Sequence, residues 1–116
     1  MAGSKIKIAV AVDNGTVAEH FGRCKGYKIF TFENGALCNK EYLANPGHKP
    51  FFLPKFLAEK NVDVVLCKGI GPKALALFES LSIKVVYGLD GKAEELAKKF
   101  IRGEISGSKN ICEHME

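Results

Sequence analysis

The feature that most constrains the fold is a nearly continuous apolar run near the N-terminus, Ile6–Val12. Such a run is typical of a central β-strand covered on both faces, because a strand with one solvated face alternates polar and apolar residues. The run is too short to cross a bilayer, and Asp13-Asn14-Gly15 ends it without a signal-peptide cleavage pattern. We therefore expect a strand in the middle of a sheet, and neither a membrane span nor a secretion signal.

Two further strand-like runs follow, Tyr27–Glu33 and Ala36–Tyr42, and Asn34-Gly35 separates them. This residue pair most readily takes the positive φ angles of a type I′ turn, so the two runs are predicted to form a β-hairpin. The preceding segment, residues 13–26, has no sustained periodicity and is predicted to be a long loop with one helical turn near Val17–Phe21. Long loops in compact folds are usually functional.

Helices and strands alternate in the second half of the sequence. The pattern predicts a helix near Pro54, the strand Val62–Cys67, the helix Pro72–Leu81, the strand Ile83–Tyr87 and a last helix between an Asp90 cap and Gly103. Periodicity predicts these buried helix positions: Leu53, Phe56, Leu57, Ala74, Leu75, Leu77, Phe78, Leu81, Ala93, Leu96, Ala97, Phe100 and Ile101.

This order of elements predicts an α/β fold, a three-layer α/β/α sandwich around a mixed five-stranded sheet. If the hairpin lies on one side of the first strand and the two later strands on the other, the winding direction reverses between the first and fourth strands. A crevice then opens at their carboxyl ends, with Asp13 and Cys67 beside it. We expect one domain over residues 5–103 and a polar tail over residues 104–116.

Charge and cysteine usage narrow the class of protein. The formal net charge is +4, and the lysines are scattered over the chain rather than gathered in a stripe with aromatic residues, so nucleic acid is not an expected partner. Four cysteines without a secretion signal indicate thiols or metal ligands in a reducing compartment. We expect a cytoplasmic protein.

The long loop contains a stretch with ligand chemistry, His20-Phe21-Gly22-Arg23-Cys24. Imidazole and thiolate both bind iron and other transition metals, and an adjacent arginine favours an anionic ligand. The spacing alone leaves two interpretations open. His20 and Cys24 are metal ligands, or His20 is an exposed loop residue and Phe21 anchors the loop on the core.

A second candidate is the turn Gly69-Ile70-Gly71 before a helix, whose N–H groups and dipole could hold an anion. It lacks the pattern of a Walker loop or a dinucleotide fingerprint, and a plain tight turn explains it equally well. Cys67 ends a buried strand, and Cys38 lies in a hairpin strand, so both are expected to be small core residues. Cys112 and His114 offer two further ligands near the C-terminus, fewer than a structural zinc site needs.

Catalytic residues are scarce. Asp13 is the only carboxylate expected in the crevice, so no paired-carboxylate or two-metal site is indicated, and no Ser/His/Asp or Cys/His arrangement follows from spacing. A nuclease would need a metal-binding carboxylate at the end of the fourth predicted strand, and the residues there are Cys67 and Lys68. We expect a binding protein rather than an enzyme.

The strand Ile8–Asp13 followed by His20–Cys24 resembles the opening of the dinitrogenase iron-molybdenum cofactor biosynthesis family, the NifX-like and NifB C-terminal-like accessory proteins. The resemblance continues through Asn45-Pro46, His48-Lys49-Pro50, Gly69–Ala74 and the Cys112/His114 tail. It implies a ribonuclease H-like motif and a role in carrying iron-sulfur or iron-molybdenum cluster precursors. It also implies that His20 is the first ligand and Cys24 the second.

Two hypotheses for function remain. In the first, His20 and Cys24 hold a cluster against Ile70-Gly71, helped by Cys67, Cys112 or His114, and the partners are metallocofactor assembly or acceptor proteins. In the second, the same loop is a docking surface of a protein-interaction or regulatory module without bound metal. The chain is expected to be a monomer or a weak homodimer, because hairpin edge strands pair between chains in some proteins only.

Overall fold

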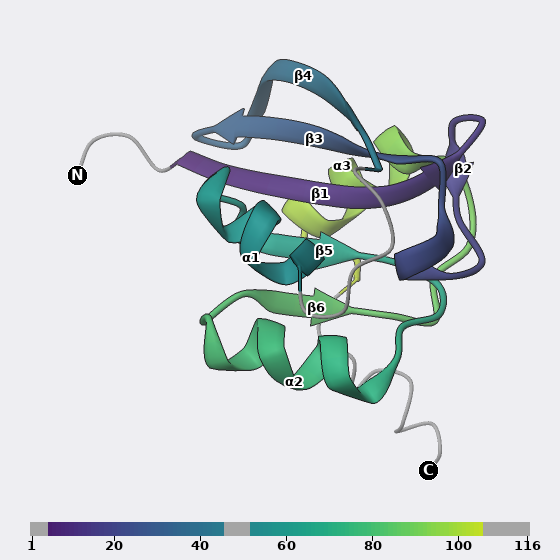
Figure 1. The fold of residues 1–116 in the computed structure, drawn as a ribbon. Coiled ribbons are helices and arrows are strands. Elements are labelled where there is room, and N and C mark those ends of the chain that lie inside the picture. The colour runs from purple at the N-terminus through teal and green to yellow at the C-terminus, as the bar shows by residue number, and fades with distance from the viewer. Residues whose placement is uncertain (1–4, 46–51, 106–116) are drawn as a thin grey trace, which may run out of the picture.

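The computed structural model describes residues 5–45 and 52–105. A mixed β-sheet with strand order β4-β3-β1-β5-β6 forms its centre (Figure 1). Its strands are β1 (Lys5–Asp13), β3 (Gly26–Glu33), β4 (Ala36–Ala44), β5 (Val64–Leu66) and β6 (Lys84–Val86). A two-residue strand, β2 (Thr16–Val17), pairs with the end of β1.

β1 occupies the middle of the sheet, as its apolar run predicts. It pairs antiparallel with β3 and parallel with β5, and β6 then pairs parallel with β5. The hairpin therefore lies on one side of β1 and the two later strands on the other. The predicted reversal of winding between β1 and β5 is confirmed.

Helices cover both faces of the sheet, because β1 alternates its apolar side chains between two cores. Ala9 and Ala11 belong to the cluster that contains Leu57 of α1 (Phe52–Glu59) and Phe78 of α2 (Pro72–Ser80). Ile8 and Val10 belong to the opposite cluster, with α3 (Ala93–Ile101). Figure 1 shows α1 and α2 on one side of the sheet and α3 on the other. We call these sides the α2 face and the α3 face.

Within residues 5–45 and 52–105 the sheet has six strands, so the prediction of five is wrong. The difference is β2, which is too short to leave a periodic signal and pairs Val17 with Val12 of β1. The predicted helical turn near Val17–Phe21 is also misplaced, since the single turn of 3₁₀ helix, η1, spans Phe21–Arg23. The ribonuclease H-like motif stays a prediction.

Two predictions about the helices are corrected. Asp90 does not cap α3, because the N-cap position is Lys92. In α2 only Phe78 is fully buried, while Ala74, Leu75 and Leu77, and Leu81 at the C-cap, are half-buried. This helix lies over the short strands near the sheet edge, where fewer side chains surround it. The predicted end of α3 is confirmed by the positive φ of Gly103.

The β3–β4 hairpin forms as predicted, with φ angles of 52° at Asn34 and 85° at Gly35. The pairing register shifts between Thr31 and Phe32, so that Cys38 stands opposite no partner residue. Cys38 is exposed, and the prediction that it is a core residue is wrong because this bulge interrupts the alternation of β4.

In the described residues, no helix is long and apolar enough to span a membrane.

Candidate functional site

The loop after β2 and the turn after β5 lie side by side at the carboxyl edge of the sheet. His20 and Gly69 form an isolated parallel bridge, and the N–H of Phe21 donates to the carbonyl oxygen of Gly69 over 2.8 Å. Gly69 leaves no room for a side chain, since a Cβ there would lie 2.7 Å from the Glu19 carbonyl oxygen. The same Cβ would lie 3.7 Å from Nδ1 of His20, so the imidazole sits beside this turn. The structure thus brings the two predicted segments together.

Aromatic packing anchors the loop on the core. The Phe21 ring is buried and lies 5.2 Å from the Tyr27 ring and 5.3 Å, edge on, from the Phe78 ring of α2. The Tyr27 hydroxyl donates a hydrogen bond of 2.8 Å to the Phe21 carbonyl oxygen. Phe21 therefore acts as the anchor that one of the two sequence interpretations proposes.

Cys24 points inward rather than toward solvent. Its single S–H lies within donating distance of two carbonyl oxygens, those of Phe21 at 3.3 Å and Gly26 at 3.2 Å, and the residue is 5% exposed. Burial raises the pKa of this thiol above its ordinary value, although a hydrogen bond with Tyr27 partly opposes that effect. In this arrangement Cys24 stabilises the loop.

Two polar side chains fix the same loop from neighbouring elements. Asn45, just after β4, donates through Nδ2 to the carbonyl oxygens of Gly22 and Cys24. Asp13 accepts the N–H of Lys25 over 2.8 Å. Asp13, expected to be a crevice carboxylate with a binding role, is used here to hold the chain between η1 and β3.

Cys67 is fully buried between the sheet and α2, with its Sγ 3.9 Å from the Val86 carbonyl oxygen. Burial raises the pKa of the Cys67 thiol from 9.0 to about 12, and the nearby Cys24 adds to the rise. The core-residue interpretation therefore describes its environment. Its predicted position at the carboxyl end of β5, directly before the glycine turn, is confirmed.

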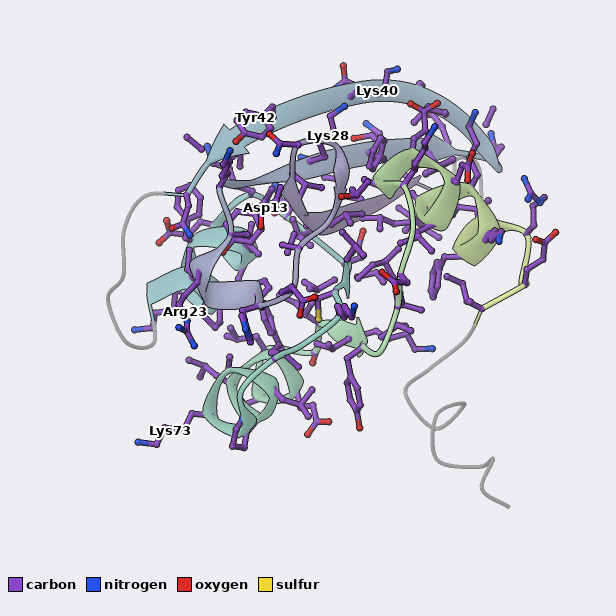
Figure 2. All side chains as sticks on the ribbon, turned by 90° about the vertical axis from the view of Figure 1, so that its right-hand side faces the viewer. Asp13, Arg23, Lys28, Lys40, Tyr42 and Lys73 are labelled. Atoms are coloured by element: carbon purple, nitrogen blue, oxygen red, sulfur yellow. The ribbon has the colours of Figure 1, made fainter. Side chains whose placement is uncertain are left out.

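Other residues carry the solvent-accessible functional groups of the site. His20 and Arg23 are exposed, Gly22 and Ile70 are half-buried, and the exposed Gly71 begins α2 without a side-chain cap. Figure 2 shows Arg23 projecting outward from η1 on the same side of the molecule as Lys73 of α2. The imidazole therefore lies beside the bridge between His20 and Gly69, with the exposed Arg23 three residues after His20 and the uncapped start of α2 three residues after Gly69.

Lys68 joins three loops at the rim of this site. Its ammonium lies 3.4 Å from a Glu19 carboxylate oxygen and 3.5 Å from an Asp90 carboxylate oxygen. These carboxylates raise the pKa of Lys68. Sequence reasoning missed this link because Asp90 resembled a helix cap and Glu19 stood in a loop with no periodicity.

The two other predicted ligands, Cys112 and His114, lie outside the described residues, as does His48. Within residues 5–45 and 52–105, no group of three or more His, Cys, Asp or Glu side chains could hold a metal ion. The described part of the chain thus presents one exposed histidine on a basic, glycine-lined surface.

Fold and site together define a class of α/β proteins in which loops meet at the carboxyl edge of a mixed sheet and form a small open surface. The chain belongs to the dinitrogenase iron-molybdenum cofactor family, whose model matches residues 4–103. This membership confirms the resemblance drawn from the strand β1 and the His20–Cys24 stretch.

Relatives share most of the chain's length. It is 31% identical over 105 residues to the uncharacterized protein MJ0580 of Methanocaldococcus jannaschii, covering 86% of this chain and 89% of the relative. The fold of this chain is similar to that in the crystal structure of PH0822, with a TM-score of 0.82 and 29% sequence identity. The match covers 93% of this chain and 99% of that one. The apo form of the orange protein from Desulfovibrio gigas is also similar in fold, with a TM-score of 0.74 and 23% sequence identity. That match covers 87% of this chain and 91% of the orange protein.

Proposed function

We propose that this protein is a non-catalytic carrier that binds an iron-sulfur or iron-molybdenum cluster precursor and hands it to a metallocofactor assembly or acceptor protein. The observation that carries the proposal is the bridge between His20 and Gly69, which holds an exposed imidazole beside a glycine turn and a helix start. The family's link to the iron-molybdenum cofactor supports the choice of cargo.

The residues at the bridge fit an anionic metal-sulfur cargo. A neutral imidazole is a good ligand for iron, and His20 is exposed, so it can reach a cluster without displacing core residues. Iron-sulfur clusters carrying thiolate ligands are anionic, and Arg23 with the N-terminus of α2 supplies positive potential at the same place. In this arrangement His20 is the protein ligand, and Cys24 and Cys67 maintain the loop from inside.

A site that encloses its cargo on one side only suits transfer. Cargo held by few protein ligands keeps open positions, which an acceptor can fill before the histidine leaves. The anchored loop, fixed by Phe21, Asn45 and Tyr27, keeps the imidazole in place without a closing lid. Cys112 and His114 remain proposed additional ligands. We also propose that residues 5–103 form the carrier domain and that the carrier acts in the cytoplasm.

The test is cluster loading without oxygen. Protein offered iron and sulfide, with and without molybdate, is assayed for iron, molybdenum, acid-labile sulfide and visible absorption. We expect loading that His20→Ala abolishes and Arg23→Gln weakens, while Cys38→Ser, which removes an exposed thiol on β4, leaves it unchanged. Full loading of a His20→Ala, Cys24→Ala double variant would overturn the site.

The burial of Cys24 and Cys67 favours a second candidate, the interaction module without metal. In that case the loop would bind a partner protein through Arg23 and His20 and would not need a cluster. Partner binding by metal-free protein, unchanged when iron and sulfide are added, would support this candidate over the carrier.

A further inference from the structure

The outer edge of β4 is a long strand edge that no described strand covers. β4 spans nine residues and pairs on one side with β3, and in the described part of the chain it ends the sheet. Alternate N–H and C=O groups of such an edge point outward and can pair with another extended segment. The edge therefore has the backbone chemistry for adding one more strand.

An aromatic residue and a lysine lie on the α3 face beside this edge. Tyr42 is 52% exposed and is the only exposed large hydrophobic residue among those described. It stands directly opposite Lys28 of β3, so both side chains lie on one face. Neither the Tyr42 hydroxyl nor the Lys28 ammonium has a hydrogen-bond or ion-pair partner within the described residues. Figure 2 shows the two side chains beside each other near Lys40.

The charge of this face is positive. Lys40 and Lys98 both contact one carboxylate, Glu94, at 3.1 Å, and Lys28 adds a third ammonium. The opposite face of the hairpin carries Glu41, which pairs with Ile29 on the α2 face. A segment added to β4 would therefore need acidic side chains toward the α3 face and uncharged ones toward the α2 face.

A second copy of the chain fits this edge poorly. When two identical edge strands pair antiparallel about a two-fold axis, each residue keeps its face, so the positively charged α3 face of one copy continues into that of the other. Like charges across neighbouring strands are destabilising. A partner with acidic residues instead offers a countercharge to Lys28 and a further one to Lys40, which shares the Glu94 carboxylate with Lys98.

We propose that the β3–β4 hairpin is a docking surface for an extended segment of a partner protein, with acidic residues at every second position, that adds to β4 as a strand. The Tyr42 ring reaches over Gly26 of β3, and the exposed part of this side chain gives apolar contact, as tyrosines at the centre of interfaces often do. Lys28 and Lys40 select the acidic face, and the β4 backbone supplies the hydrogen bonds. This surface lies on different elements from the His20 loop, and the proposal does not rest on the cargo.

The test uses the full chain and a fluorescein-labelled peptide, Glu-Val-Glu-Thr-Glu-Val-Glu, followed by fluorescence anisotropy and by amide shifts of ¹⁵N-labelled protein. We expect binding with shifts centred on residues 39–43. Lys28→Glu should weaken it about fivefold or more, and Tyr42→Ala about tenfold, as losses of roughly 1 and 1.4 kcal/mol would give. Lys55→Glu, the same charge change on α1, and His20→Ala should leave the affinity unchanged.

A matched peptide separates strand addition from general charge attraction. A scrambled peptide of the same composition, Glu-Glu-Val-Thr-Glu-Glu-Val, places acidic residues on both faces and should bind more weakly. Equal affinity for both peptides, equal loss in Lys55→Glu, or shifts outside β4 would overturn the proposal. Sedimentation showing a dimer that Tyr42→Ala dissociates would overturn it in favour of a second copy.

Discussion

The Tyr27 hydroxyl donates its hydrogen bond to the carbonyl oxygen of Phe21, and this contact joins the central sheet to the loop that carries His20. The same carbonyl accepts the Cys24 thiol. Phe21 and Cys24 of the His20–Cys24 stretch thus bond with Tyr27 of β3 around one buried oxygen, and the exposed imidazole depends on these three residues for its position. The His20–Cys24 stretch therefore serves in large part to fix the conformation of its own loop.

Replacing Tyr27 with Phe tests that device. The change keeps the ring and removes the donor, so we expect a loss of about 1 kcal/mol in the free energy of unfolding, measured with urea. The weaker thiol donor remains at the Phe21 oxygen, which limits the cost. Tyr87→Phe removes the hydroxyl of a half-buried tyrosine from another part of the core and should change stability little. An equal loss in both variants would contradict the role of the Tyr27 hydrogen bond.

Thiol reactivity provides a direct check on the burial of the cysteines. Cys38 is exposed, while Cys24 and Cys67 are buried with raised pKa values. In a Cys112→Ser variant at pH 8, we expect one thiol to react with Ellman's reagent quickly and two only on unfolding in urea. Rapid reaction of a second thiol in the native protein would show that Cys24 opens to solvent and would revive it as a ligand.

Alkaline pH should destabilise the fold because of the same burial. The folded state holds the Cys67 proton up to a pKa of about 12, whereas the unfolded thiol loses it near 9.0. Stability is therefore complete below pH 9 and falls as pH rises toward 12, by about 1.4 kcal/mol for each pKa unit of the difference. Urea midpoints between pH 8 and 10.5 should fall more steeply for the wild type than for Cys67→Ala. Parallel slopes would show that this thiol does not contribute.

Much of the fold follows from local pattern. The run Ile6–Val12 had to be a central strand because few polar residues interrupt it, and Asn34-Gly35 fixes a turn through the φ angles that it tolerates. β2 could not be predicted, since two residues are too few to show an alternation of polar and apolar side chains. Their pairing with β1 forms only when the chain folds back on itself. The site shows the same division. The sequence identified His20 as a candidate ligand and Gly69 as part of a candidate anion-binding turn. Only the folded structure shows that Cys24 turns inward and that Lys68 links Glu19 with Asp90.

Alanine should destabilise the protein at Gly69 and have little effect at Gly71, although both glycines belong to the turn after β5. A Cβ at Gly69 would meet the Glu19 carbonyl oxygen at 2.7 Å, which is backbone and cannot rotate away. A Cβ at Gly71 would meet nothing within 4 Å. Gly69→Ala should therefore push the His20 loop off the turn and cost about 1 to 3 kcal/mol, as overpacking does.

The matched variant Gly71→Ala should change the free energy of unfolding by less than about 1 kcal/mol, because alanine fits its extended backbone conformation. Urea denaturation gives both values, and cluster loading gives the functional counterpart. If the bridge between His20 and Gly69 positions the ligand, Gly69→Ala loses loading even under conditions where it stays folded, and Gly71→Ala keeps it. Full loading of a folded Gly69→Ala protein would mean that the imidazole binds its cargo without support from the turn.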